Sequence, residues 1–388
     1  MKKTLLLLSF VYSLSFAQEY KNSIQSTKDE FFRYKSSQNI SFQSYQKAHY
    51  DAIQNYKDEL IQVWDEPKLT TKNNLISYSP DKKTRTNIDF KNEEIILQTI
   101  ANNPEEANRK LKTALAKAVT IDTKSLYQND PLQKKLSRIA RPSKIITSPI
   151  NSKPILSPII FQKPPTKKSV RAYVDKHIKY KNVKITKSKK VKHSRIYTSR
   201  IKMPSHTIIK RSKIYYDTVK KESIRHKVPL PLIFAVIHSE SSFNPLAKSH
   251  APAFGLMQIV PKTAGRDAYK FLYNKKRLVS STYLYNSKNN IKMGTAYLHI
   301  LYYRYLKDIR NEDSRLYCTI AAYNTGAGNV AWAFTKNNDI RRASRKINTM
   351  SSREVYNYLL KHLKYDEPKY YLKNVTARMS IYHKLYGT

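Results

Sequence analysis

Three groups of side chains in the second half of the chain have the types needed for acid chemistry on a polar substrate. Glu240 ends an apolar helical stretch, Leu230-Pro-Leu-Ile-Phe-Ala-Val-Ile-His-Ser239, whose apolar residues are expected to pack in a core. Gly255-Leu-Met-Gln258 and Ala322-Tyr-Asn324 follow later. A carboxyl group in apolar surroundings has a raised pKa and can donate a proton. Such an acid, facing amide and phenol groups, is what cleavage of a glycosidic bond requires.

Taken alone, Glu240 fits a solvated glutamate at a helix end better than a catalytic acid, but its neighbours favour catalysis. Asn244-Pro245 stops the helix, because the residue before proline disfavours the helical region. Gly255 permits a close approach of the backbone to a ligand. Gln258 supplies an amide for sugar hydroxyl or N-acetyl groups, and Met257 an apolar wall. In this order, the residues predict a sugar-cleaving site.

A second carboxylate is missing near Glu240. Ordinary glycosidases place two carboxylates around the bond that they cleave. No Asp or Glu occurs from Ser241 to Arg266, and Asp267 follows a predicted loop and helix start. A single carboxylate indicates that water is not the nucleophile. A hydrolytic enzyme that uses Asp267 is the nearest alternative.

The elements that must position these residues differ between the two halves of the chain. From about residue 210 to the end, apolar residues recur at helical spacing and predict an all or nearly all α domain. The predicted helices lie near 210–226, 229–242, 261–272, 288–307, 313–323, 351–363 and 367–385.

The N-terminal half predicts a small α+β domain. Tyr45 to Trp64 form an amphipathic helix, and Pro104-Glu-Glu106 begins another that continues through Val119. The predicted strands are Leu75 to Tyr78, Arg85 to Phe90 and Glu94 to Ile100. A Pro-rich basic insertion follows, and after it come a short helix (Arg171 to Ile178) and two edge strands (Lys181 to Ile185 and Arg195 to Ile201). The fold class is therefore α+β.

On these motifs, residues 210–388 resemble the family 1 lytic transglycosylase domain of the goose-lysozyme-like enzymes that cut peptidoglycan. Glu240-Ser241 matches the catalytic Glu-Ser of that family, and Tyr371 matches its late cleft tyrosine. The resemblance implies a lysozyme-like catalytic (SLT) domain with Glu240 as its acid and base. The residues that it implies for substrate binding are Ser241, Ser249, Met257, Gln258, Tyr323, Asn324 and Tyr371.

The resemblance also implies a reaction that needs no metal and no cofactor. Glu240 would protonate the oxygen between N-acetylmuramic acid and N-acetylglucosamine. As a carboxylate it would then take a proton from the muramyl O6 hydroxyl, which closes a 1,6-anhydro ring. Besides the hydrolytic enzyme, the other alternative to this reaction is a non-catalytic scaffold that binds the cell wall.

Residues 41–209 are similar to the N-terminal domain of the murein transglycosylase C subfamily. Two positions depart from that pattern inside the catalytic domain: Ala251 replaces a serine and Thr325 replaces a glycine. The subfamily carries a lipid-modified cysteine at its mature start, whereas Ala17-Gln18 stands here, so lipid anchoring is not supported.

The first residues and the charge of the chain indicate where the protein is located and which molecules it binds. Residues 1–17 read as a signal peptide, with an uncleaved membrane anchor as the alternative, and 18–40 as a flexible leader. The expected location is the periplasm, with a surface attraction to the outer membrane. The 72 Lys and Arg against 28 Asp and Glu give a net charge of +44. In an exported protein this favours anionic wall or lipid partners over nucleic acid. A lineage-wide compositional bias toward Lys is the alternative explanation of the charge. Cys318 is the only cysteine and is interpreted as a buried hydrophobe.

Overall fold

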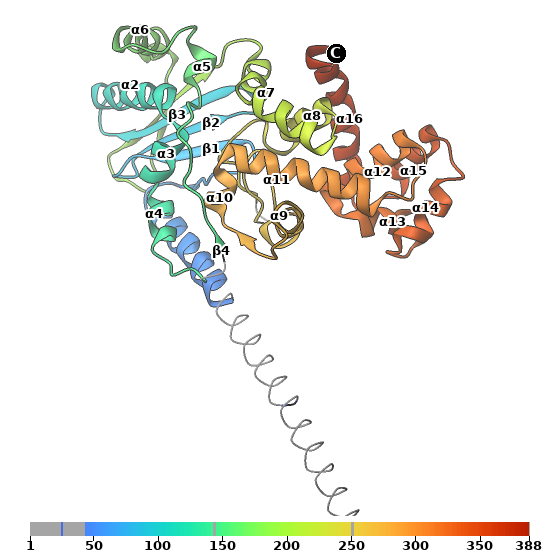
Figure 1. The fold of residues 1–388 in the computed structure, drawn as a ribbon. Coiled ribbons are helices and arrows are strands. Elements are labelled where there is room, and N and C mark those ends of the chain that lie inside the picture. The colour runs from blue at the N-terminus through green and yellow to red at the C-terminus, as the bar shows by residue number, and fades with distance from the viewer. Residues whose placement is uncertain (1–24, 26–42, 143–144, 250–251, 388) are drawn as a thin grey trace, which may run out of the picture. The chain divides into compact units, whose positions relative to one another are not determined.

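The computed structural model describes residues 25, 43–142, 145–249 and 252–387 (Figure 1). The predicted signal peptide, most of the leader and Ala251 lie outside the described residues. The chain forms two compact units, 1–57 with 135–143 and 58–134 with 144–388. Residues 43–61 are helical, which confirms the first predicted helix with an end three residues earlier than expected.

The second unit contains a five-stranded antiparallel sheet in the order β1-β2-β3-β6-β5. Its strands are β1 (Asn74–Tyr78), β2 (Thr84–Asp89), β3 (Glu94–Ala101), β5 (Lys184–Lys187) and β6 (Arg195–Lys202). The prediction that Arg195 to Ile201 form an edge strand is wrong, because β6 pairs with β3 on one side and with β5 on the other. The edge position belongs to β5, as predicted, although that strand begins at Lys184.

Helix α2 (Pro104–Thr120) packs against one face of this sheet. Asn103 caps it by accepting a hydrogen bond from the Glu106 amide at 2.8 Å, and Pro104 fits the first turn because it lacks an amide hydrogen. Leu111 and Leu115 are fully buried, one turn apart, toward the strands. The predicted helix start is confirmed.

Shorter elements lie between α2 and β5 in the chain. They are α3 (Thr123–Asn129), α4 (Pro131–Ser137), β4 (Ile145–Ile146), α5 (Ser157–Ile160), α6 (Lys167–His177) and the 3₁₀ turn Tyr180–Asn182. Helix α6 begins four residues before the predicted Arg171, because Thr166 and Ser169 form a reciprocal capping box. The sequence analysis did not recognise that start signal.

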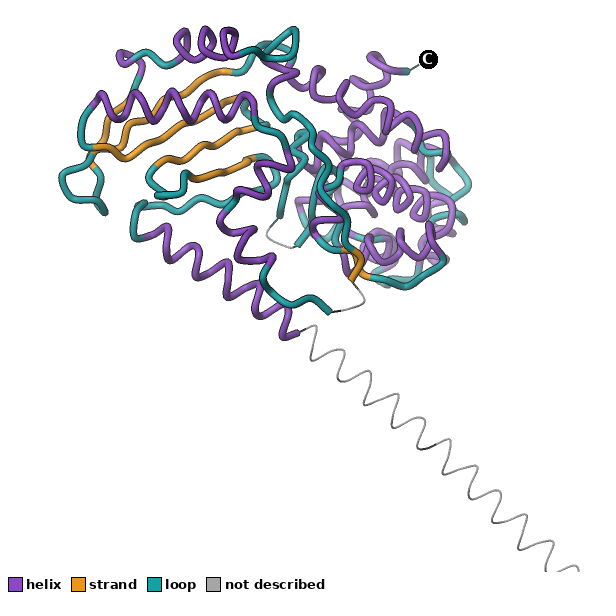
Figure 2. The backbone as a smooth tube through the Cα atoms, turned by 60° about the vertical axis from the view of Figure 1, so that its left-hand side comes forward, coloured by secondary structure: helices purple, strands orange, loops and turns teal. Residues whose placement is uncertain are grey.

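The C-terminal part is helical, as predicted, apart from the two-residue strand β7 (Leu278–Val279), which pairs in parallel with β4. Figure 2 shows the five-stranded sheet on one side of the second unit and most of the C-terminal helices on the other. Its helices are α7 (Thr207–His226), α8 (Leu230–Ser241), α9 (Arg266–Tyr273), α10 (Ser281–Tyr285), α11 (Ser287–Ile300), α12 (Glu312–Thr325), α13 (Ala327–Thr335), α14 (Ile340–Ile347), α15 (Ser352–His362) and α16 (Asp366–Tyr386).

Two of the predicted long helices are interrupted. The π-helical turn Pro261–Gly265 precedes α9, and the π-helical turn Leu301–Tyr305 ends α11. Helices α10, α13 and α14 were not predicted. Within the described ranges, no helix combines the length and the apolar character needed to cross a membrane.

Helix α8 lies in the core of this part. Its residues from Leu232 to Ile237 are at most 2% exposed, so the helix is apolar around most of its circumference. Helix α16 packs along it, and Arg378 of α16 donates a 2.7 Å hydrogen bond to the Ser239 hydroxyl. The last turn of α8, which carries Glu240, is therefore held on a rigid support.

Candidate active site

Glu240 is a buried carboxyl group in the last turn of α8, with 5% of the residue exposed. Burial raises the pKa of Glu240 to about 7, because the charged form loses its hydration. Lys72 and the Tyr371 hydroxyl oppose this shift, and Glu367 adds to it. An acid with a pKa near neutrality can give up a proton and take one back.

Lys72 joins Glu240 to a second carboxylate. Its Nζ lies 3.9 Å from Oε2 of Glu240 and 3.8 Å from Oε1 of Glu367 at the start of α16. The side chains of Lys72 and Glu367 are 38% and 73% exposed, whereas that of Glu240 is 7% exposed. The ammonium group therefore stands at the border between solvent and the buried acid. Sequence reasoning missed both neighbours.

The segment that carries Lys72 comes from the N-terminal half and is tied to the turn after α8. The fully buried Asn244 donates from Nδ2 to the Lys72 carbonyl at 3.2 Å, and Ser242 Oγ donates to Asn73 Oδ1 at 3.3 Å. The buried Arg211 guanidinium bonds the carbonyls of Ser242 and Phe90. These hydrogen bonds hold the lysine in place above the acid.

The turn at Gly255 is built around Asn290 of α11. Gly255 has φ +75°, and a Cβ there would overlap the Asn290 amide and the Leu284 carbonyl. Asn290 donates to the carbonyls of Phe254 and Leu284, both at 2.8 Å, and accepts from the Met257 amide at 2.8 Å. The glycine therefore admits a neighbouring side chain, whereas the sequence predicted the approach of a ligand.

Ser241 and Met257 are buried in the packing that supports the site, which differs from the predicted contact with substrate. Ser241 is fully buried, and its hydroxyl lies 2.8 Å from the Leu256 carbonyl and 3.1 Å from that of Ile237. The Met257 side chain is fully buried against Gly294, which leaves room for it. Ser241 thus joins α8 to the turn that bears Gln258, and Met257 joins this turn to α11.

Gln258 presents an amide oxygen without a partner. It has φ +48°, and its Nε2 donates to the carbonyls of Gly255 at 2.9 Å and Ala247 at 3.2 Å. Its Oε1 is buried and accepts no hydrogen bond within the described part of the chain. That oxygen therefore keeps its capacity to accept a hydrogen bond. Ser249 accepts from the Ala253 amide at 3.2 Å and so closes the neighbouring loop.

Two tyrosines lie near Glu240, and Asn324 follows one of them at the end of α12. The Tyr323 hydroxyl donates to the Met257 carbonyl at 2.8 Å. The buried Tyr371 hydroxyl is close enough to the Glu240 carboxyl to lower its pKa. It makes no hydrogen bond of good geometry to any described group. Burial, and next the charge of Glu240, raise the pKa of both phenols, so they stay neutral. The half-buried Asn324 amide makes no hydrogen bond to another described residue.

Asp267 and Cys318 lie apart from this chemistry. The Asp267 carboxylate accepts a hydrogen bond from the Tyr305 hydroxyl at 3.1 Å and is not among the charges that act on Glu240. The acidic neighbour of Glu240 is Glu367 instead. Cys318 is fully buried, and burial raises the pKa of its thiol, which fits its interpretation as a small core residue.

Comparison with known proteins relates this site to a family. Residues 217–345 match the family model of the transglycosylase SLT domain. The matched SLT segment contains Glu240, Gln258 and Asn324, whereas Lys72 and Tyr371 lie outside it.

Curated relatives carry a consistent name. The chain is 42% identical over 182 residues to the membrane-bound lytic murein transglycosylase C of Photorhabdus laumondii, and 41% identical to that of Yersinia pestis. Each alignment covers 47% of this chain and 50% of the relative. The chain thus spans about half the length of the curated relatives it matches.

A solved structure is also similar. The 70 kDa soluble lytic transglycosylase of Escherichia coli matches with 26% identity and a TM-score of 0.35. The match covers 45% of this chain and 24% of that protein.

Proposed function

We propose that this protein is a lytic transglycosylase of peptidoglycan. It cleaves the β-1,4 bond between N-acetylmuramic acid and N-acetylglucosamine and leaves a 1,6-anhydromuramyl end, with Glu240 as the only general acid and base. The observation that carries the proposal is the buried Glu240, whose pKa is raised to about 7 and whose carboxyl interacts with the Tyr371 hydroxyl and with Lys72. The match of residues 217–345 to the SLT domain supports it.

In this reaction the protonated Glu240 gives its proton to the glycosidic oxygen, and the bond to the anomeric carbon breaks. The resulting carboxylate takes the proton of the muramyl O6 hydroxyl while O6 attacks the anomeric carbon. Lys72, about 4 Å away, stabilises that carboxylate between the two steps. Holding O6 beside the reacting carbon lowers the barrier through proximity. Gln258 Oε1, the Asn324 amide and the Tyr371 hydroxyl orient the sugar, while Ser241, Ser249, Met257 and Tyr323 hold the surrounding turns.

Mass spectrometry of the muropeptides released from purified sacculi tests the proposal. Anhydro ends are expected, and reducing ends would establish hydrolysis instead. Glu367 is the residue that hydrolysis would need, because it is the second carboxylate near Glu240. Under the proposal, Glu367→Gln keeps the rate within about tenfold and still gives anhydro ends. A loss of about 10³-fold or more would indicate a hydrolase with paired carboxylates.

We predict that Lys72→Gln moves the alkaline limb of the pH–rate profile to higher pH. The ammonium group favours ionised Glu240, so its removal raises the pKa of that carboxyl above about 7. Glu367→Gln should move the limb to lower pH, because a negative neighbour is removed. The measurement is kcat for wall digestion from about pH 5 to about pH 9, on both sides of the pKa of Glu240.

Lys68→Gln is the matched control, since Lys68 is a half-exposed lysine of the same segment that lies 3.6 Å from Glu66. It should leave the profile unchanged. An unmoved limb in Lys72→Gln would contradict the assigned role of Lys72.

A further inference from the structure

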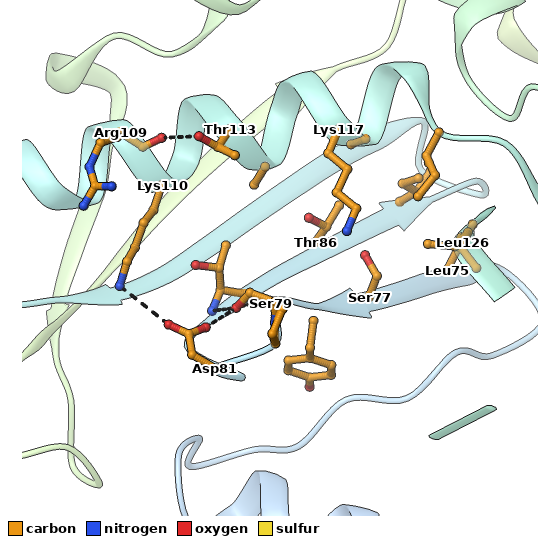
Figure 3. Close-up of a pocket in the computed structure, with 17 residues that line it drawn as sticks. Leu75, Ser77, Ser79, Asp81, Thr86, Arg109, Lys110, Thr113, Lys117 and Leu126 are labelled. Atoms are coloured by element: carbon orange, nitrogen blue, oxygen red, sulfur yellow. Dashed lines mark hydrogen bonds and ion pairs between the residues drawn. The ribbon is translucent and has the colours of Figure 1, made fainter. Parts of the chain in front are cut away.

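A second hollow lies in the N-terminal part of the same unit, among residues that the proposed reaction does not use. It is a cavity of about 440 Å³ between α2 and the β1–β2 hairpin (Figure 3). Under α2, strands β3 and β6 contribute large buried residues such as Leu97 and Tyr197. Ser77 of β1 and Thr86 of β2, by contrast, are small and pair directly in register. The space between these strands and the helix therefore stays open.

The strand side of the cavity carries two hydroxyl groups that are free to bind. Thr86 is only 8% exposed, and its hydroxyl makes no hydrogen bond to another described residue. The same holds for the half-buried Ser77. A threonine hydroxyl buried to this extent ordinarily has a partner. A ligand in the cavity would supply one.

The helix side carries cations. Arg109, Thr113 and Lys117 are spaced by four in α2 and so line one face of it. Neither Arg109 nor Lys117 forms an ion pair within the described ranges, and Figure 3 shows Lys117 reaching from the helix toward the strands. Asp81 at one end of the cavity lies 3.9 Å from Lys110, which also lies 2.8 Å from Glu106. The lining thus carries three cations (Arg109, Lys110 and Lys117) against the single carboxylate of Asp81. The cavity is therefore suited to an anion.

The lining also defines the shape of the ligand. Leu75, Ile88 and Leu126 provide an apolar part of the lining, and Figure 3 shows Leu75 and Leu126 together at one end of the cavity. Small-molecule sites commonly have volumes of about 300–1,000 Å³, so the space accommodates a few amino-acid residues. Carboxylates form strong charge-assisted bonds to Arg and Lys, and small aliphatic side chains fit an apolar lining.

We propose that this cavity binds a short peptide with free carboxylates, the chemistry of the peptide stems of the cell wall. The identity of the stems as the source rests on the proposed function, whereas the site itself does not. The cavity gives the protein a second binding site for the wall, built from residues of the N-terminal sheet and α2. Thr86 and Ser77 bond the peptide backbone, and Arg109 and Lys117 hold its carboxylates.

Titration calorimetry on the full chain carrying Glu240→Gln tests this, because turnover is then removed. The probe is a preparation of stem peptides released from sacculi. Adding Arg109→Gln with Lys117→Gln should weaken binding at least tenfold. Thr86→Val should also weaken it without loss of folded protein, since the lost hydroxyl has no internal partner. Lys181→Gln with Lys187→Gln removes the same charge from exposed positions and should change nothing.

Three outcomes would overturn the proposal. They are equal peptide binding by both double variants, equal binding of peptides whose carboxylates are converted to amides, and binding of anionic lipid vesicles but not peptide. Failure of the proposed function is recognised separately. A wild-type protein that binds stem peptides through Arg109 and Lys117 but releases no anhydro ends would keep the site and lose the reaction.

Discussion

Replacing Glu240 by Gln should reduce wall digestion by at least about 10³-fold while the protein stays folded. General acid–base groups contribute about 10²–10⁴-fold each, and here one carboxyl serves both proton transfers. Gln fills the same space but can neither donate an acidic proton nor take one from O6. The measurement is the rate of release of anhydromuropeptides from sacculi by the wild type and the variant.

The stability of the same variant provides an independent check. The pKa of Glu240 is about 7 in the folded chain, against an ordinary value of 4.5, so the folded state binds the proton more tightly. Glu240 is neutral in both states below pH 4.5, and its burial costs the wild type stability as pH rises toward 7. The full shift corresponds to roughly 3 kcal/mol. Glu240→Gln should therefore raise Tm more at pH 8 than at pH 4.

Glu312→Gln, at the exposed start of α12, serves as the control for loss of a carboxylate. It should retain wild-type digestion and show no such pH-dependent gain. Retention of full activity by Glu240→Gln would refute the catalytic assignment.

Asn290→Ala should lower the free energy of unfolding by about 3 kcal/mol or more. The side chain is fully buried and bonds three backbone groups of the turn that carries Gln258 and its surroundings. Its loss leaves those groups unpaired, and each unsatisfied buried group costs roughly 1–3 kcal/mol. Denaturant titration measures the loss. Activity should fall as well, because Gln258 loses its support.

Asn289 offers a control on the same helix. It is half-buried, and its amide lies 3.5 Å from the Tyr283 carbonyl, at the limit of hydrogen bonding. Asn289→Ala should cost less than about 1 kcal/mol. If the two variants were equally destabilised, Asn290 would not be the centre of the turn.

Local signals in the sequence predicted much of the fold. Asn103-Pro104 marks the start of α2 through its cap, and the apolar run before Glu240 marks a buried helix that ends in a polar residue. These signals act within a few residues of where they are written. The interior position of β6 could not be predicted in this way, because it depends on the pairing of β6 with both β3 and β5.

The candidate site shows the same division. The sequence predicted that Glu240, Gln258, Tyr323 and Tyr371 would gather, and in the structure the carboxyl of Glu240 interacts with the phenols of Tyr323 and Tyr371. The contact of Gln258 with a sugar stays a prediction. The sequence could not predict Lys72, whose place above Glu240 depends on hydrogen bonds between distant segments. Nor did it show that Met257 would turn inward, since that requires the missing side chain of Gly294 on another helix.

Because Lys72 lies beside Glu240, the pKa of this acid depends on both halves of the chain. The helical half alone contains the glutamate, the amides and the tyrosines. Without the N-terminal half, Glu240 would lack Lys72, the cation that lowers its pKa. Substitutions in the sheet that shift residues 71–73 should therefore change the pKa of Glu240 while the helices stay unchanged. If the proposed reaction is correct, adaptation of its pH dependence to a more acidic or more alkaline setting can proceed through the sheet.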